Sequence, residues 1–286
     1  MAFEPAQYSS DSLRDPFVLY GESFASRLLL GTARYPSPAT LEAAIEASRP
    51  AMITVALRRQ SAVGSGEGQT LGGQAFWQML RTLGVPVLPN TAGCFTAQEV
   101  ITTAMMAREV FETDWIKLEL IGDDYTLQPD TLNLPSVAET LIREGFKVLP
   151  YCTEDLVLCR RLVDVGCQAL MPWGAPIGTG RGAINPLAMR TLRERLPDTP
   201  LIVDAGLGLP SHAAQVLEWG YDGVLLNTAV AQAAYPVNMA RAFAQAVEAG
   251  RTAYLAGPIP ERDVAQASTP VVGMPFWHAA GAEDRA

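Results

Sequence analysis

The chain alternates short apolar segments with longer amphipathic ones eight times, and this alternation is what most limits the folds open to it. Strand-like segments, rich in aliphatic residues, are expected at 28–31, 52–57, 85–88, 116–121, 148–151, 169–172, 201–204 and 224–227. Helix-like segments, with apolar residues three or four positions apart, are expected at 38–48, 75–83, 97–111, 136–144, 156–165, 186–196, 211–219 and 239–249. Eight successive βα units favour an α/β fold of the TIM-barrel type, a closed (β/α)8 barrel.

An open, doubly wound sheet is the alternative fold. It would usually carry a G-x-G-x-x-G turn after its first strand, and the residues found there, Gly31-Thr32-Ala33-Arg34, do not match. We expect one barrel domain over residues 1–286, with an N-terminal extension at about 1–17 and a C-terminal tail at about 258–286. The glycine-rich residues 61–73 form a long loop, expected at the catalytic face either as a lid or as a disordered link.

Charge and composition exclude several classes of function. The net charge is −9 and the basic residues form no cluster beyond short pairs, so no nucleic-acid partner is expected. The chain has no apolar run of about 18 residues and no signal-peptide pattern at its start, which predicts no membrane span and a cytoplasmic location.

Metal ligands of the common kinds are scarce in the sequence. The two histidines and four cysteines include no C-x-x-C pair, so neither a zinc site nor a redox motif is indicated. We therefore expect no metal and no cofactor, and only a carboxylate site for magnesium stays open as an alternative. The cysteines are interpreted as reduced, mostly buried thiols.

One lysine stands out because the chain has only two, against nineteen arginines. Lys117 interrupts the apolar strand 115–121, and strand parity puts it on the same face as Glu119. In a barrel this face points inward, near the strand's C-terminal end, where barrel active sites lie. Desolvation lowers a lysine's pKa and frees the amine to form an imine with a carbonyl. The alternative is a purely structural Lys117–Glu119 ion pair. Lys147, at the start of the next strand, is expected at the opposite, structural end.

Asp204 ends the strand 201–204, and its parity with Ile202 allows it to face inward. A carboxylate there can move protons beside a lysine imine, or it can simply cap the following turn. Small-residue loops follow the last three strands, at 174–182, 205–208 and 227–229. Backbone N–H groups of such loops can hold a phosphate, and barrels often bind phosphate after strands seven and eight. A phosphorylated carbonyl substrate is therefore indicated, for an aldolase, a sugar-phosphate isomerase or a related enzyme.

Longer motifs narrow this choice. They lie at 26–32, 53–59, 89–94, 117–123, 171–180, 203–208 and 224–229. Together, in this order, they resemble those of bacterial thiazole synthase, a barrel enzyme of thiamine biosynthesis, over about residues 18–273. The chain departs from the usual pattern at Arg181, Leu209, His212 and Tyr235, none of which replaces a residue with an assigned chemical role.

The resemblance implies that the enzyme condenses 1-deoxy-D-xylulose 5-phosphate, dehydroglycine (2-iminoacetate) and sulfur into a thiazole phosphate. The sulfur is implied to come from the C-terminal thiocarboxylate of a ubiquitin-like sulfur carrier protein, and the dehydroglycine from a separate enzyme. Lys117 matches the imine-forming lysine, and Glu119 and Asp204 match the acid–base groups. The matching substrate-binding residues are Gly178, Ala205, Gly206, Asn227 and Thr228. A homo-oligomer is also implied.

Two other functions share part of this pattern. A Schiff-base sugar-phosphate aldolase would use the same lysine and phosphate loops, without a sulfur donor. A non-catalytic barrel that binds a carrier protein or a phosphorylated metabolite would use Lys117 only as an ion-pair partner. The presence of Lys117, Glu119 and Asp204 together disfavours pure binding, which does not require them.

Overall fold

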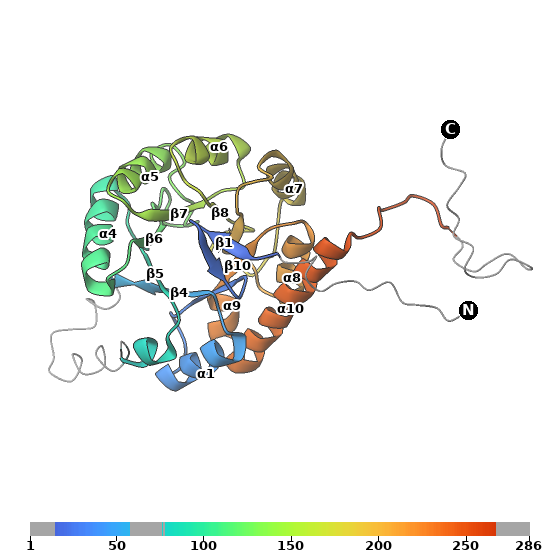
Figure 1. Cartoon of the computed structure of the whole chain (residues 1–286), viewed down its shortest axis with the longest axis horizontal. Helices are drawn as coiled ribbons and strands as arrows, with labels where there is room; N and C mark the ends of the chain where they lie inside the picture. Colours follow the sequence, from blue (N-terminus) through green and yellow to red (C-terminus); the bar gives the residue numbers. More distant parts are fainter. Residues whose placement is uncertain (1–14, 58–75, 77, 267–286) are drawn as a thin grey trace, which may run out of the picture. The chain divides into compact units, whose positions relative to one another are not determined.

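The protein folds as a closed barrel of parallel strands. The computed structural model describes residues 15–57, 76 and 78–266. The barrel strands are β3 (Leu28–Gly31), β4 (Met52–Ala56), β5 (Val87–Asn90), β6 (Trp115–Leu118), β7 (Lys147–Cys152), β8 (Met171–Pro172), β9 (Ile202–Asp204) and β10 (Gly223–Leu226). They pair in the order β8-β7-β6-β5-β4-β3-β10-β9, and a parallel bridge between Leu170 and Leu201 closes the ring (Figure 1). The expected TIM barrel is confirmed.

Helices surround this ring in Figure 1. They are α1 (Pro38–Ser48), α4 (Ala97–Phe111), α5 (Leu134–Arg143), α6 (Leu156–Asp164), α7 (Pro186–Arg195), α8 (Pro210–Glu218), the short α9 (Thr228–Ala231) and α10 (Pro236–Ala256). Residues 76 and 78–83 are helical too, within the expected helix 75–83. Side-chain caps start several of them: Ser37, Thr96 and Asp155 each accept a backbone N–H from the first turn.

Several elements differ in length from the expectation, and β6 and α10 are two of them. Strand β6 ends at Leu118 rather than at residue 121, because the chain beyond it leaves the sheet and Ile121 bridges to Pro129 instead. Helix α10 runs over 21 residues rather than 239–249. A proline at its first position and a glycine just beyond its end mark these bounds, and Phe243 and Val247 bury its inner face.

An N-terminal hairpin, which follows the extension expected at about 1–17, closes one end of the barrel; no strand was expected before residue 28. Strands β1 (Phe17–Leu19) and β2 (Glu22–Phe24) pair antiparallel around a two-residue turn with positive φ at Tyr20 and Gly21. The Tyr20 ring meets Trp115 edge-on at 5.5 Å, and its hydroxyl donates to the carbonyl of Val148. Since Trp115 opens strand β6, the hairpin fills the N-terminal end of the barrel with apolar side chains.

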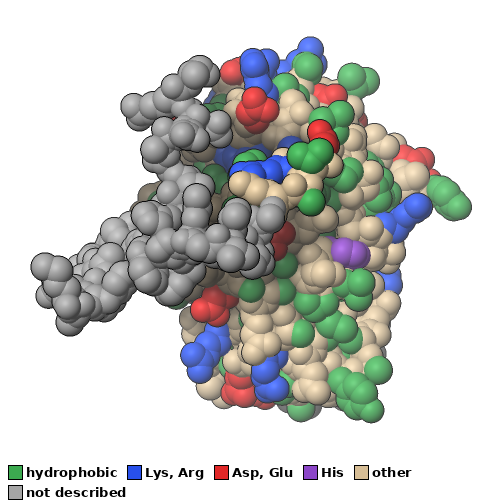
Figure 2. Space-filling view, turned by 90° about the vertical axis from the view of Figure 1, so that its right-hand side faces the viewer, with side chains coloured by type: hydrophobic (Ala, Val, Ile, Leu, Met, Phe, Trp, Pro, Cys, Tyr) green, Lys and Arg blue, Asp and Glu red, His purple; other side chains and the backbone are tan. Residues whose placement is uncertain are grey.

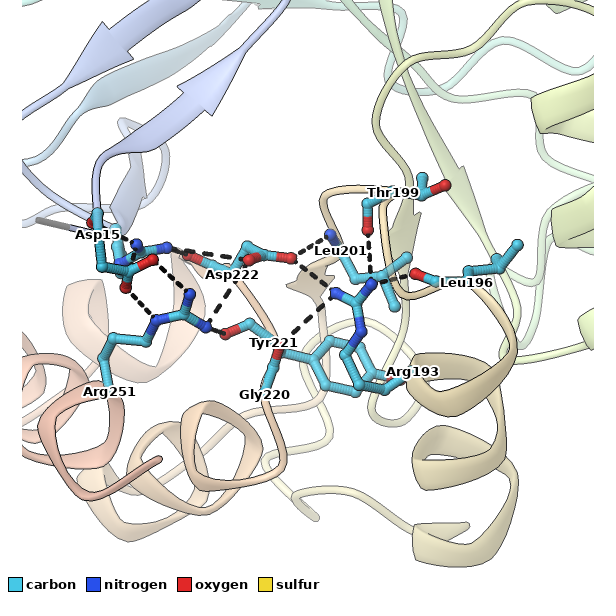
Figure 3. Close-up of polar contacts among 10 residues, drawn as sticks. Asp15, Arg193, Leu196, Thr199, Leu201, Gly220, Tyr221, Asp222 and Arg251 are labelled. Atoms are coloured by element: carbon cyan, nitrogen blue, oxygen red, sulfur yellow. Dashed lines mark hydrogen bonds and ion pairs between the residues drawn. The ribbon is translucent and has the colours of Figure 1, made fainter. Parts of the chain in front are cut away.

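A charged network lies at the same end (Figure 3). Asp15 contacts Arg27 and Arg251, and thereby ties the chain before the hairpin to helix α10. Asp222 accepts hydrogen bonds from Arg193 at 2.8 Å and from the backbone N–H of Leu201 at 2.9 Å. The network therefore joins the starts of β9 and β10 to α7 and α10, away from the C-terminal ends of the strands.

The remaining described residues, 257–266, are exposed and carry neither helix nor strand. The loop that was expected at 61–73 lies outside the described residues, as do residues 1–14 and 267–286. Within the described part of the chain, no helix is both long enough and apolar enough to cross a bilayer. On the face that Figure 2 shows, basic, acidic and apolar side chains are interspersed.

Candidate functional site

Three charged side chains meet inside the barrel, although they come from two distant parts of the chain. The Lys117 ammonium lies 2.6 Å from Oδ2 of Asp204 and 3.0 Å from Oε1 of Glu119. All three residues are 6% exposed or less. Lys117 points inward from β6, Glu119 follows one residue after that strand, and Asp204 ends β9. The parity argument therefore gave the right direction for each of them.

The protonation of this cluster differs from the expectation. Burial by itself lowers the pKa of Lys117, but the adjacent charges of Asp204 and Glu119 outweigh it and raise the pKa above the ordinary lysine value. The expected lowered pKa was wrong, because it considered desolvation without the two carboxylates. Lys117 therefore rests as an ammonium ion. Burial raises the pKa of Asp204 to about 6, against the opposing effect of Lys117. Asp204 is therefore more basic than an ordinary carboxylate, and the lysine proton can pass to it.

Several neighbours of the cluster were not singled out from the sequence. The Thr91 hydroxyl accepts the backbone N–H of Glu119 at 2.8 Å and donates to its carbonyl at 2.7 Å, which fixes the chain just after β6. The Tyr151 ring lies 5.8 Å from the Lys117 ammonium, within the range of a cation–π contact. Asn90 pairs in register with Lys117 and also lines the site. A polar residue at the end of an apolar strand was the available indication for Asn90.

The cluster lies in a cavity of about 640 Å³. This volume suits a small organic ligand. All eight residues expected in the site line it: Lys117, Glu119, Gly178, Asp204, Ala205, Gly206, Asn227 and Thr228. The cavity lies at the C-terminal ends of the strands, opposite the hairpin, as barrel active sites do.

Small residues let the loops of the cavity pack backbone against backbone. Gly206 has φ +81°, and a Cβ built on it would lie 2.3 Å from the backbone nitrogen of Ala175. The preceding residue, Ala205, also has positive φ, which is costly for a residue with a side chain and recurs at binding sites. At positions 205 and 206, the loop after β9 therefore has a backbone conformation that residues with a side chain disfavour.

The other lysine and the arginine of the glycine loop lie outside the cluster. Lys147 pairs with Glu22 at the hairpin end of the barrel, where a structural role was expected. Arg181 is exposed. Among the described residues, no group of three or more His, Cys, Asp and Glu side chains is arranged to hold a metal.

Comparison with known proteins adds independent findings. A family model described as "Thiazole biosynthesis protein ThiG" matches residues 18–270. A thiazole synthase of Cupriavidus metallidurans is 90% identical over 286 residues, with both chains covered fully. A thiazole synthase of Ralstonia nicotianae is 76% identical over 268 residues, 94% of this chain and 96% of that protein.

Solved structures give the same picture of the fold. A chain from the crystal structure of the Amycolatopsis orientalis BexX/CysO complex is similar with a TM-score of 0.76 and 28% identity, over 87% of this chain and 100% of that chain. Because the family model spans most of the sequence and the relatives align over nearly their full length, the chain belongs to the ThiG family of thiazole biosynthesis proteins.

Proposed function

We propose that this thiazole synthase works through an imine between Lys117 and the ketone of 1-deoxy-D-xylulose 5-phosphate. The observation that carries the proposal is the buried ammonium of Lys117 between two carboxylates in a cavity that suits a sugar phosphate. A lysine held in this way loses its proton to a neighbour as the substrate carbonyl arrives, and its free amine is then the nucleophile.

The proton route follows from the distances. Asp204, 2.6 Å from the ammonium, takes the proton, and the amine adds to the ketone carbon. The proton returns to the carbinolamine oxygen, which leaves as water, and the C=N bond forms. The protonated imine draws electrons from the adjacent carbon, so Glu119, 3.0 Å from the lysine nitrogen, is suited to remove a proton there.

The glycine loops are proposed to hold the phosphate group. Gly178, Ala205, Gly206, Asn227 and Thr228 line the same cavity as the lysine, and their side chains are small or neutral. Backbone amides in turns bind phosphate without a basic side chain. This arrangement would hold the charged end of the sugar on one side of the cavity and its ketone beside Lys117.

The other reactants are proposed from family membership. Dehydroglycine comes from a separate enzyme, and sulfur comes as the thiocarboxylate of a ubiquitin-like carrier protein. A similar solved chain belongs to a BexX/CysO complex, which supports binding of a second protein. Exposed apolar side chains follow strands at the cavity end: Phe95, Tyr125 and Leu209 are 49%, 93% and 52% exposed. They offer contact area to such a partner. We also propose that the protein forms a homo-oligomer in the cytoplasm.

The imine is tested by borohydride trapping with 1-deoxy-D-xylulose 5-phosphate, followed by peptide mass spectrometry. We expect a reduced adduct on Lys117 that is absent in Lys117→Arg. Lys147→Arg is the matched control, because it makes the same change in the ion pair at the hairpin end, and it should leave the adduct unchanged. Absence of an adduct on the folded, substrate-saturated protein would refute the Schiff-base mechanism.

Family membership favours this function over both alternatives considered from the sequence. A Schiff-base aldolase would give the same adduct, so sulfur incorporation separates the two activities. A carrier-binding barrel without catalysis would give no adduct at all.

A further inference from the structure

One histidine near the cavity has no role in the proposed chemistry, although it connects two of the loops that line it. His212 lies in the first turn of α8, partly buried. Its Nδ1 accepts the backbone N–H groups of Gly208, at 3.2 Å, and of Leu209, at 3.3 Å. Because both partners can only donate, Nδ1 must be the unprotonated nitrogen of the ring. His212 therefore holds the end of the loop after β9.

The same ring also touches the loop after β8. A Cβ built on Gly182 would lie 3.0 Å from Cγ of His212 and 3.1 Å from two further ring atoms, so the ring packs directly on this glycine. Gly182 has φ +77°, and its N–H donates to the carbonyl of Gly206 at 2.8 Å. A side chain at Gly182 would displace the ring or the loop.

His212 thus contacts both loops, which also meet each other through the hydrogen bond between Gly182 and Gly206. Gly178 and Gly180 of the first loop and Gly206 and Gly208 of the second line the cavity, whereas His212 does not. The ring can therefore act on a ligand only through the loops.

We propose that His212 is a positioning residue that fixes the two glycine loops relative to each other and so sets the affinity of the cavity for a phosphate group. The inference rests on the proposed function in taking these loops as the phosphate site. It assigns to His212 no contact with substrate and no proton transfer. Loss of its two hydrogen bonds leaves the loop after β9 free to shift, and a phosphate held by backbone amides is sensitive to such a shift.

The test compares a phosphorylated and an unphosphorylated sugar in the full-length protein. Trapping on Lys117 is measured against the concentration of 1-deoxy-D-xylulose 5-phosphate and of 1-deoxy-D-xylulose. In His212→Ala we expect the half-saturating concentration of the phosphate ester to rise about tenfold, in keeping with the loss of two hydrogen bonds. The maximal trapping rate and the half-saturation for the unphosphorylated sugar should change less than about twofold.

His212→Gln is the rescue variant, because its side-chain oxygen can accept from the same N–H groups. It should recover most of the affinity. Ser211→Ala, one position earlier on α8 and exposed, is the matched control and should have no effect. An equal change for both sugars, no change for either, or no recovery in His212→Gln would overturn the proposal.

Two further measurements test the role of His212 independently of the first variant. Should His212→Ala fail to fold, Gly182→Ala perturbs the same contact from the other loop and should weaken binding of the phosphate ester selectively. Calorimetric titration with inorganic phosphate measures the affinity of the phosphate site in the absence of imine formation. Binding of phosphate should be about tenfold weaker in His212→Ala than in the wild type. Wild-type protein that binds phosphate but gives no Lys117 adduct would refute the imine mechanism and leave this inference standing. Equal phosphate affinity in both proteins would refute the inference alone.

Discussion

Replacement of Asp204 by Asn separates proton transfer from the shape of the site. Asn keeps the size of the side chain but cannot take the proton that Lys117 must lose. Loss of a general base costs roughly 10²- to 10⁴-fold in rate. Glu119 remains 3.0 Å from the ammonium and can take over part of this role, so we expect the lower end, a fall of about 100-fold in the rate of imine trapping.

The pH dependence of the trapping rate gives a second quantitative prediction. With a pKa raised to about 6, Asp204 is almost fully ionised at pH 7.5 and roughly one-tenth ionised at pH 5. Because the ionised form accepts the proton, trapping by the wild type should fall about tenfold as pH drops from 7.5 to 5. Asp204→Asn has no carboxyl group to titrate at this position, so this fall should disappear.

The assay is single-turnover trapping with 1-deoxy-D-xylulose 5-phosphate and cyanoborohydride, which tolerates this pH range, with the Lys117 adduct measured by mass spectrometry. Glu22→Gln is the control, since it removes the carboxylate from the Lys147 ion pair at the hairpin end. It should trap at the wild-type rate. The reasoning fails if Asp204→Asn traps as fast as the wild type, or if it keeps the tenfold fall toward pH 5.

Other predictions concern stability and can be read from urea denaturation. Gly206→Ala should lower the free energy of unfolding by about 2–4 kcal/mol, because of its positive φ and the backbone nitrogen 2.3 Å from the new Cβ. Gly93→Ala, with φ +78° but open space around it, should cost only about 1 kcal/mol. Equal losses of stability in the two variants would refute the predicted clash at Gly206. Asp222→Ala should cost about 2–3 kcal/mol through the partly buried network, and a loss under 1 kcal/mol would contradict it. Tyr20→Phe removes the bond to the Val148 carbonyl and should cost about 1 kcal/mol, with trapping on Lys117 unchanged.

Much of the barrel was predictable because its determinants are local. The period of apolar residues distinguished strands from helices, and eight repeats of the pair left few topologies. The alternation of side chains along one strand was enough to predict that Lys117 and Glu119 point into the barrel. The hairpin at Phe17–Phe24 was missed because each of its strands has only three residues, too few for a periodic pattern.

The protonation of the site depended on contacts that no local pattern contains. From the sequence, Asp204 was as consistent with a turn cap as with a proton acceptor. Its place 2.6 Å from the Lys117 ammonium follows from ring closure, which brings β9 and β6 to face the same interior. The expected lowered pKa of the lysine failed for the same reason, since a long-range contact reversed the effect of burial.

The sequence by itself determined the barrel, the end of it that carries the site and the residue types available there, because periodicity and strand direction act over a few residues. The tertiary structure decided which of those residues touch. It brought two carboxylates to one ammonium, filled the opposite end with the hairpin, and set the His212 ring against two glycine loops. These contacts join distant parts of the chain, and only the packing of the closed barrel sets distances between such parts.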